Sequence, residues 1–399
     1  MKKLLIIGAG ILQVAVIKKA KEMGIFTLVA DGNPNAMGLP LADKPIVANI
    51  VDPKALLSIA LREKIDGVIH PCSEVAMAAV GTINDIMHLS GVGLEAAIRA
   101  TNKEKMRKAF ETGNAPSPFS KSAKTLNEAF EIINEINSDY IFKPSRNSGS
   151  RGVTRLNKNA IDVDIRVAFQ RAFDNSFDES VVIEKYIEGP EFSVEMAIWD
   201  NDPQVIAVTD KLTSGTPYFV ELGHNQPSRH SDETLLKIKN AAIAGCRALE
   251  LNWCVAHVEI KLQDDEPFII EIGARLGGDF ISTELVHLST GIDFTAAAID
   301  LALGIIPDLS PKHPQQGAAI RYFTPPAGLL KSINFPDELL FDTNIYAFEV
   351  YKNVGDIIPD LRSSLDRSGH VIATGENAYD AITNAENALN QIEFEIGQF

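Results

Sequence analysis

The chain has 399 residues, of which 45% are hydrophobic and 23% charged, and its formal net charge at pH 7 is −16. This size predicts a globular protein of roughly two or three domains, and the negative charge argues against a general nucleic-acid-binding protein. No apolar run approaches the roughly 20 residues needed to cross a bilayer. Cys72, Cys246 and Cys254 form neither a C-x-x-C motif nor an even disulfide framework, so we expect no zinc, no structural disulfide and a cytoplasmic location.

The first hundred residues alternate between strand and helix patterns. We expect strands at 2–8, 26–31 and 67–71 and helices at 11–23, 52–64 and 75–90. Alternation at this spacing predicts a doubly wound parallel α/β domain. The turn Gly8-Ala9-Gly10 with Asp31 beyond it suggests a dinucleotide site, but Gln13 stands at the third glycine of G-x-G-x-x-G, and a tight strand-to-helix turn is the simpler interpretation.

A basic helix from Asn102 to about Gly113 opens a second domain. A helix at 124–136 and a short strand at 139–144 follow, and the strand delivers Lys143 into the loop SRNSGSRGV at 145–153. Glycines in this loop let backbone N–H groups approach an anion, while serine and basic side chains add donors. The pattern predicts a phosphate-binding loop, although the P-loop motif is absent; a flexible hairpin loop is the alternative.

Residues 181–199 are typical of a strand, a turn and a second strand. In the second strand Phe192, Val194, Met196 and Ile198 point one way, and Glu191, Ser193 and Glu195 point the other. The backbone of residues 184–187 can offer hydrogen-bonding groups to an adenine edge, and a carboxylate there suits ribose hydroxyls. A solvated acidic face explains the same pattern.

The polar segment 209–227 is rich in glycine and proline and too long for a simple connection. We expect it to cover a substrate, with Lys211, Glu221 and His224 as candidate contacts; a surface loop is the alternative. Helices are expected at 231–249 and 293–303.

Residues 255–279 are typical of two strands joined by the polar loop 263–267, and this arrangement puts Glu259 directly opposite Glu271 with Cβ atoms roughly 5 Å apart. The same register pairs Leu262 with Phe268, Ile260 with Ile270 and Val258 with Ile272. Facing carboxylates repel each other unless a proton or a cation lies between them, and oxygen-rich sites suit Mg²⁺ or Mn²⁺. An exposed hairpin with a solvated acidic face is the alternative.

Beyond this hairpin, Arg275 is expected where charge develops on a transferred phosphoryl group. Residues 307–314 then look like a linker. Strands at 318–323, 345–350 and 369–375 and a helix at 378–392 predict a small C-terminal α+β domain. Its Arg321 is a candidate anion contact, although a structural ion pair is the preferred interpretation.

Taken in order, these motifs resemble the ATP-grasp superfamily over nearly the whole chain. The resemblance implies a multidomain fold with an N-terminal domain at 1–99, an ATP-grasp domain at 100–306 whose glycine-rich-loop subdomain covers about 118–187, and a C-terminal domain at 307–399. It implies Mg²⁺ or Mn²⁺ at Glu259 and Glu271, and catalytic roles for Arg275 and Lys143. The implied ATP contacts are Lys103, Lys143, Ser148, Gly149, Ser150, Gly152, Glu184, Lys185, Tyr186, Ile187 and Glu191. The candidate substrate contacts are Lys211, Glu221, His224, Arg275, Gly277 and Gly278.

The resemblance also implies the reaction. A substrate carboxylate would attack ATP to give an acyl phosphate and ADP, and an amine would then displace phosphate to form an amide. Residues 367–389 are similar to the C-terminal domain of amino-acid ligases and biotin-carboxylase-like members, which favours amino acids as the small-molecule substrates. Nucleic-acid and membrane partners are not expected, and a homodimer is what the resemblance implies for assembly.

Three alternatives stay open. They are a phosphoribosylglycinamide synthetase, a biotin-carboxylase-like enzyme, and a nucleotide-binding regulator without catalysis. Gly273 is the reason to consider a non-catalytic regulator, because the superfamily usually has asparagine at this position.

Overall fold

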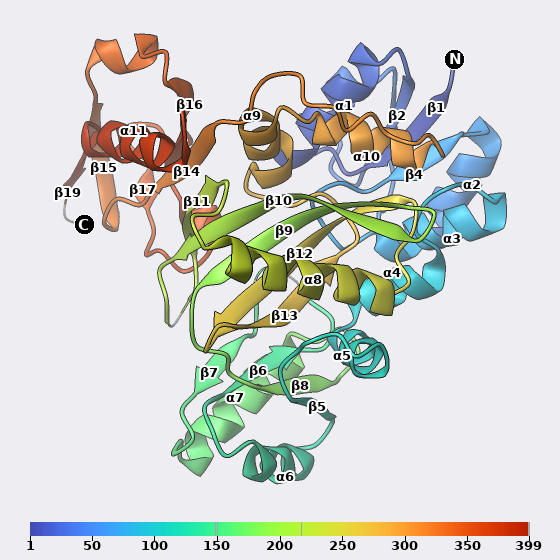
Figure 1. Cartoon of the computed structure of the whole chain (residues 1–399), viewed down its shortest axis with the longest axis vertical. Helices are drawn as coiled ribbons and strands as arrows, with labels where there is room; N and C mark the ends of the chain where they lie inside the picture. The colour runs from blue at the N-terminus through green and yellow to red at the C-terminus, as the bar shows by residue number, and fades with distance from the viewer. Residues whose placement is uncertain (148, 150, 217, 398–399) are drawn as a thin grey trace.

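The computed structural model describes residues 1–399 except residues 148, 150, 217 and 398–399 (Figure 1). The predicted phosphate contacts Ser148 and Ser150 therefore lie outside the described residues. At the N-terminus a four-stranded parallel sheet has the order β3-β2-β1-β4. Its elements are β1 (Lys3–Ile7), α1 (Ile11–Glu22), β2 (Phe26–Asp31), η1 (Leu39–Leu41), β3 (Lys44–Val47), α2 (Pro53–Glu63), β4 (Gly67–Ile69), α3 (Met77–Met87) and α4 (Leu94–Thr101).

Side chains of β1 alternate between two hydrophobic cores, one on each face of this sheet. Leu4 and Ile6 pack in the cluster that contains α1 residues, whereas Leu5 and Ile7 pack in the cluster that contains α2 and α3 residues. Helices therefore cover both faces, and the predicted doubly wound α/β architecture is confirmed. The sequence interpretation missed α4, which lies just before the basic helix α5.

The segment after α4 forms a small unit with its own sheet and core, at the lower end of Figure 1. Its antiparallel sheet has the order β5-β8-β6-β7. Tyr140, Phe142 and Ile183 pack in its core with residues of α6 and α7. The elements of the small unit are β5 (Ser120–Ala123), α6 (Leu126–Ile136), β6 (Tyr140–Pro144), β7 (Thr154–Leu156), α7 (Asp162–Asp174) and β8 (Val181–Lys185). Helix α5 (Lys103–Thr112) precedes them and packs Met106 and Phe110 in the core that contains α2 and α3 residues.

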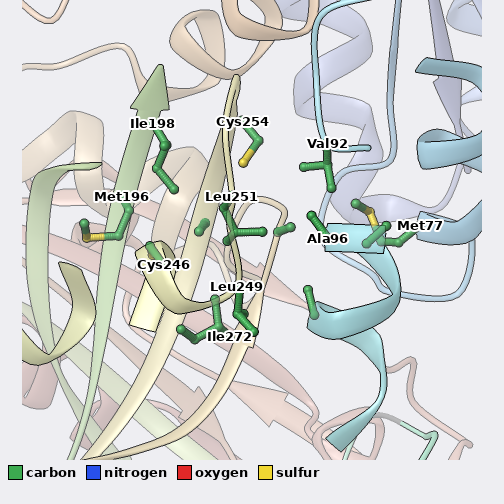
Figure 2. Packing of buried hydrophobic residues seen from close by; sticks show 14 of the residues in the cluster. Met77, Val92, Ala96, Met196, Ile198, Cys246, Leu249, Leu251, Cys254 and Ile272 are labelled. Atoms are coloured by element: carbon green, nitrogen blue, oxygen red, sulfur yellow. The ribbon is translucent and has the colours of Figure 1, made fainter. Parts of the chain in front are cut away.

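An eight-stranded sheet with the order β13-β12-β9-β10-β11-β14-β18-β16 forms the centre of the molecule. Its strands separate two cores: Ile198 packs on the face covered by α8, and its neighbour Ala197 packs on the face covered by α10. Figure 2 shows Met196, Ile198 and Cys254 on one side of the first core and Val92 and Ala96 on the other. The elements are β9 (Glu191–Trp199), β10 (Asp202–Thr213), β11 (Glu221–Gln226), α8 (Asp232–Ala248), β12 (Cys254–Gln263), β13 (Glu266–Gly273), η2 (Ile281–Leu285), α9 (Val286–Thr290) and α10 (Phe294–Ala302).

The polar segment 209–227 is not a long covering loop, and that prediction was wrong. Most of it belongs to β10 and β11, which pair with each other, and only residues 214–220 connect them. Glycine and proline content misled the sequence interpretation because Gly223 lies within β11, where a side chain would meet the carbonyl oxygen of Ile320 on the neighbouring strand.

The last hundred residues continue the central sheet. Strand β14 pairs with β11, and β18 and β16 extend the sheet beyond it. Helix α11 packs on β14 and β18, at the left of Figure 1. No helix in the described part of the chain combines the length and apolar character that crossing a bilayer requires. The elements are β14 (Gly317–Phe323), β15 (Gly328–Asn334), η3 (Asp337–Phe341), β16 (Ile345–Val350), β17 (Ile357–Ile358), η4 (Ser364–Asp366), β18 (Gly369–Gly375), α11 (Ala378–Asn390) and β19 (Glu393–Gly397).

Candidate active site

A cleft with a volume of about 210 Å³ brings together residues of the N-terminal unit, the small unit and the central sheet. Most residues predicted from the sequence line it. These are Lys103, Lys143, Gly149, Glu184, Lys185, Tyr186, Ile187, Glu191, Lys211, Glu221, Glu259, Glu271 and Arg275. Four other predicted residues within the described part of the chain do not line it, namely Gly152, His224, Gly277 and Gly278.

The two carboxylates at the centre of the prediction do face each other. Glu259 on β12 is the register partner of Glu271 on β13. The predicted pairing of Val258 with Ile272 is also confirmed. On the turn side of the carboxylates the expected register was wrong, because a bulge between Glu259 and Ile260 puts Ile260 opposite Ile269 and Leu262 opposite Pro267. The turn is consequently shorter than predicted, with Asp264 and Asp265 both at positive φ. The bulge lies on the turn side of the pair, so the carboxylates keep their predicted positions.

Each of these carboxylates contacts a different lysine. Lys103 Nζ is 2.9 Å from Glu271 Oε1, and Lys211 Nζ is 3.1 Å from Glu259 Oε1. Burial opposes ionisation of Glu259, but the charges of Lys211 and His257 outweigh it and hold the pKa of that carboxyl well below its usual range. The two ammonium groups therefore offset the repulsion between the carboxylates and the cost of burying them. A bound cation could take the place of these ammonium groups.

Lys211 is shared among several acidic groups. Its Nζ is 2.6 Å from Glu191 Oε1 and 3.9 Å from Glu221 Oε1, in addition to the contact with Glu259. Burial lowers the pKa of Lys211, yet these three carboxylates raise it well above its usual value. One lysine thus links the predicted ribose carboxylate, a predicted substrate contact and a predicted metal ligand.

Lys143 belongs to a buried triad with Glu184 and Arg107. Lys143 Nζ donates to Glu184 Oε2 at 2.7 Å, and Arg107 Nε donates to Glu184 Oε1 at 2.6 Å. Burial disfavours the charged form of Glu184, but the two cations lower the pKa of its carboxyl to about 2. Glu184 is only 1% exposed, because the two cations cover its carboxylate and its strand pairs with a neighbour on each side.

The backbone of residues 184–187 is partly occupied within the protein. The N–H of Lys185 donates to Phe119 O at 2.9 Å, and that of Tyr186 donates to Asp139 O at 2.8 Å. The ring of Tyr186 contacts two cations, with Arg155 Cζ 3.8 Å and Lys261 Nζ 4.6 Å from its centroid. These contacts fix the segment where it borders the cleft.

Arg275 is held by a residue that the sequence interpretation missed. Its Nε donates to Glu74 Oε1 at 2.8 Å, and its Nη1 donates to Leu276 O at 3.1 Å. Glu74 lies between β4 and α3, at the carboxyl edge of the parallel sheet, where functional side chains of such sheets gather. A side chain at position 273 would place its Cβ 3.0 Å from Arg275 Nε. Gly273 therefore leaves the space that the guanidinium fills.

A second missed feature is the buried pair formed by Glu195 and His257. The alternative of a solvated acidic face was wrong for Glu195, because this residue is 0% exposed. His257 Nδ1 is 2.5 Å from Glu195 Oε1, and His257 also lines the cleft. Burial lowers the pKa of His257, but the charge of Glu195 raises it to about 9 overall. A Cβ on Gly277 would lie 2.6 Å from His257 Nδ1, so Gly277 supports this pair from outside the cleft.

His224 and Arg321 are both buried away from the cleft. His224 Nε2 is 3.7 Å from Asp279 Oδ2, and Asp279 is in turn bound by Arg367. Arg321 pairs with Glu386 at 3.0 Å, which confirms the structural ion pair that was preferred over an anion contact.

Two family models match the sequence: the ATP-grasp domain matches residues 136–284, and the L-amino acid ligase C-terminal domain 2 matches residues 321–397. The chain contains an ATP-grasp domain. Within the ATP-grasp superfamily, the matches group it with ATP-dependent ligases that form carbon–nitrogen bonds.

Similar proteins agree with this grouping. Alanine–anticapsin ligase of Bacillus subtilis (strain 168) is 27% identical over 319 residues, which cover 69% of this chain and 66% of that protein. This chain thus spans about two thirds of the length of that relative. The crystal structure of phosphoribosylglycinamide synthetase from Anaerococcus prevotii has a TM-score of 0.79 at 25% identity and covers 99% of this chain and 100% of that one. The structure of L-amino acid ligase from Bacillus licheniformis has a TM-score of 0.85 at 20% identity and covers 100% of this chain and 99% of that one. At this identity the likeness shows a shared fold.

Proposed function

We propose that this ATP-grasp protein is a carboxylate–amine ligase that joins two amino acids at the expense of ATP, through an acyl phosphate. The observation that carries the proposal is the facing pair of Glu259 and Glu271, with Lys103 and Lys211 bound to them in one cleft. An anionic pair next to lysines suits a divalent cation together with phosphate groups, because each can neutralise the other.

The residues present fit a magnesium ion. Glu259 and Glu271 supply oxygen ligands, which Mg²⁺ prefers, and Mg²⁺ commonly completes its coordination with water and substrate phosphates. No cluster of three or more His, Cys, Asp or Glu side chains suited to a metal occurs among the described residues, so the nucleotide would have to complete the site. When bound there, the ion supplies positive charge to the transferred phosphoryl group.

The lysines then gain a second role. With a divalent ion held by Glu259 and Glu271, the ammonium groups of Lys103 and Lys211 would be available to contact phosphate oxygens. Lys143 and Gly149 line the cleft from the small unit and are the contacts we propose for the phosphates, and Arg275 would stabilise charge on the acyl phosphate. In the adenine site, Ile187 N–H is the donor we propose, because the N–H groups of Lys185 and Tyr186 are already used.

In the reaction, a carboxylate oxygen of the first amino acid attacks the γ-phosphorus of ATP and ADP leaves. The amine of the second amino acid then attacks the acyl carbon, phosphate leaves, and the ammonium proton passes to solvent. The protein's residues position these groups and exclude water, so no nucleophilic side chain is required. The match of residues 321–397 to the amino-acid ligase model supports amino acids as substrates.

A second candidate function is a phosphoribosylglycinamide synthetase, which the 25% identity to that enzyme from Anaerococcus prevotii favours. The test is Mg²⁺-dependent ADP release, screened with single amino acids, with pairs of amino acids, and with glycine plus phosphoribosylamine, each product being weighed by mass spectrometry. We expect release to require two amino acids and the product mass to equal their sum less water. Binding of ATP without ADP release in any mixture would contradict the proposal and favour a regulator.

A further inference from the structure

Helix α5 presents two basic side chains, four residues apart, to the cleft side of the molecule. Lys103 Nζ contacts Glu271 Oε1 and also donates to Asn147 O at 3.0 Å. One turn further along, Arg107 reaches the neighbouring residue of the same strand, since its Nη2 donates to Ile270 O at 2.7 Å. A single helix face therefore contacts two consecutive residues of β13.

Arg107 also reaches into the small unit. Its Nε binds one carboxylate oxygen of Glu184, and Lys143 binds the other. The guanidinium thus connects the strand that carries Glu271 with the carboxylate that holds Lys143. Arg107 does not line the cleft, so it acts on Glu271 and Lys143 only through its contacts with Ile270 and Glu184.

Burying the charged guanidinium of Arg107 costs free energy unless its ion pair and hydrogen bonds compensate for the lost hydration. Arg107 is 7% exposed, and its Nη1 is buried without a hydrogen-bond partner in the described part of the chain. Apolar residues of similar size often stabilise a protein as well as a buried ion pair does. Stability alone is therefore a weak reason for an arginine at this position.

We propose that Arg107 is a positioning residue, which aligns Lys143 with Glu271 by occupying one oxygen of Glu184 and the carbonyl of Ile270. The proposal rests on the proposed function, because it takes Lys143 as a phosphate contact and Glu271 as a metal ligand. With two cations and one carboxylate, the triad carries a net positive charge that favours phosphate. Without Arg107, the carboxylate of Glu184 pairs with Lys143 alone. This pairing draws the Lys143 ammonium group toward Glu184, and the net positive charge of the triad is lost.

The test compares Arg107→Met with the double variant Arg107→Met/Glu184→Gln, because the second change removes the carboxylate that would retain Lys143. ATP binding is measured by calorimetry with Mg²⁺, and kcat and KM are measured with the substrates found by the ADP-release screen. We expect Arg107→Met to weaken ATP binding at least tenfold and the double variant to recover at least threefold of that loss. Unchanged binding in Arg107→Met, or additive losses in the double variant, would overturn the proposal.

Arg99→Met is the matched control, because Arg99 lies on the adjacent helix α4 and pairs with Glu250, whose side chain is 76% exposed; its ATP binding should equal that of the wild type. Should Arg107→Met fail to fold, Arg107→Lys keeps the charge but loses the two-pronged contact, and we expect it to lower kcat at least threefold. Equal kcat in that variant counts against the role. If the wild type releases no ADP, the proposed function fails, while the calorimetric comparison still decides the role of Arg107.

Discussion

Glu259 and Glu271 are register partners on neighbouring strands, and each carboxylate is neutralised by a different lysine, Lys211 and Lys103. Lys211 also contacts Glu191 and Glu221, so it is shared among three carboxylates. Glu259 and Glu271 would hold a divalent cation, and Lys103 and Lys211 would then be available to phosphate oxygens, so we expect binding of metal and binding of phosphate to favour each other.

Glu271→Gln should reduce turnover at least a hundredfold, because it removes a charged metal ligand and leaves Lys103 without its partner. The measurement is Mg²⁺-dependent ADP release with saturating substrates. Glu266→Gln is the control, since Glu266 begins the same strand and is exposed. Near-normal activity in Glu271→Gln would contradict the assignment of the site.

Lys211→Met should lower the free energy of unfolding by on the order of 3 kcal/mol, because three carboxylates lose their common cation. Addition of Mg²⁺ without nucleotide should restore part of this loss by binding the freed carboxylates. Thermal unfolding with and without Mg²⁺ measures both effects. Lys237→Met removes an exposed ion pair with Asp265 and is the control. Its free energy of unfolding should stay close to that of the wild type, and Mg²⁺ should not change it.

Gly277→Ala should destabilise the protein by about 1–3 kcal/mol. The new methyl group would lie 2.6 Å from His257 Nδ1 and 2.9 Å from Glu195 Oε1, although the backbone at this position is not in the left-handed region. Gly278→Ala provides the comparison, because the nearest atom to its Cβ is 4.0 Å away. Equal urea midpoints for the two variants would show that the buried pair tolerates the methyl group.

The stability of the protein should depend on pH through Glu184. Its pKa is lowered from 4.5 to about 2 on folding, so its contribution is fully present above about pH 4.5 and is lost as the pH falls through 2. In Glu184→Gln, the free energy of unfolding should be lower at pH 7 and should change less between pH 5 and 2, by on the order of 3 kcal/mol. Urea unfolding across this range tests it, with exposed Glu376→Gln as the reference. Parallel pH profiles for Glu184→Gln and the wild type would contradict this prediction.

Features set by short-range periodicity could be predicted from the sequence. The alternation of side chains placed Glu259 opposite Glu271, and the order of strands and helices predicted the doubly wound N-terminal unit. The bulge next to Glu259 was not predictable, because Ile269 and Ile270 on the partner strand are both apolar and either could have paired with Ile260.

Features set by packing between distant segments were missed. The burial of Glu195 depends on His257, which is 62 residues further along the chain. Arg275 and its partner Glu74 are 201 residues apart, and nothing in either local sequence indicates the other. Strands β10 and β11 look polar in sequence because Lys211 and Glu221 line the charged cleft, while Thr209, Asn225 and Gln226 are buried with hydrogen-bonding partners.

The continuous eight-stranded sheet has a consequence for protein engineering. Strand β14 completes the hydrogen bonding of β11. The last hundred residues therefore cannot be replaced as a separate domain by joining two proteins at position 306. A chimera joined there would pair β11 with a foreign strand, and a deletion would expose an open edge that recruits other chains. Transplants between relatives should instead carry β11 and β14 together.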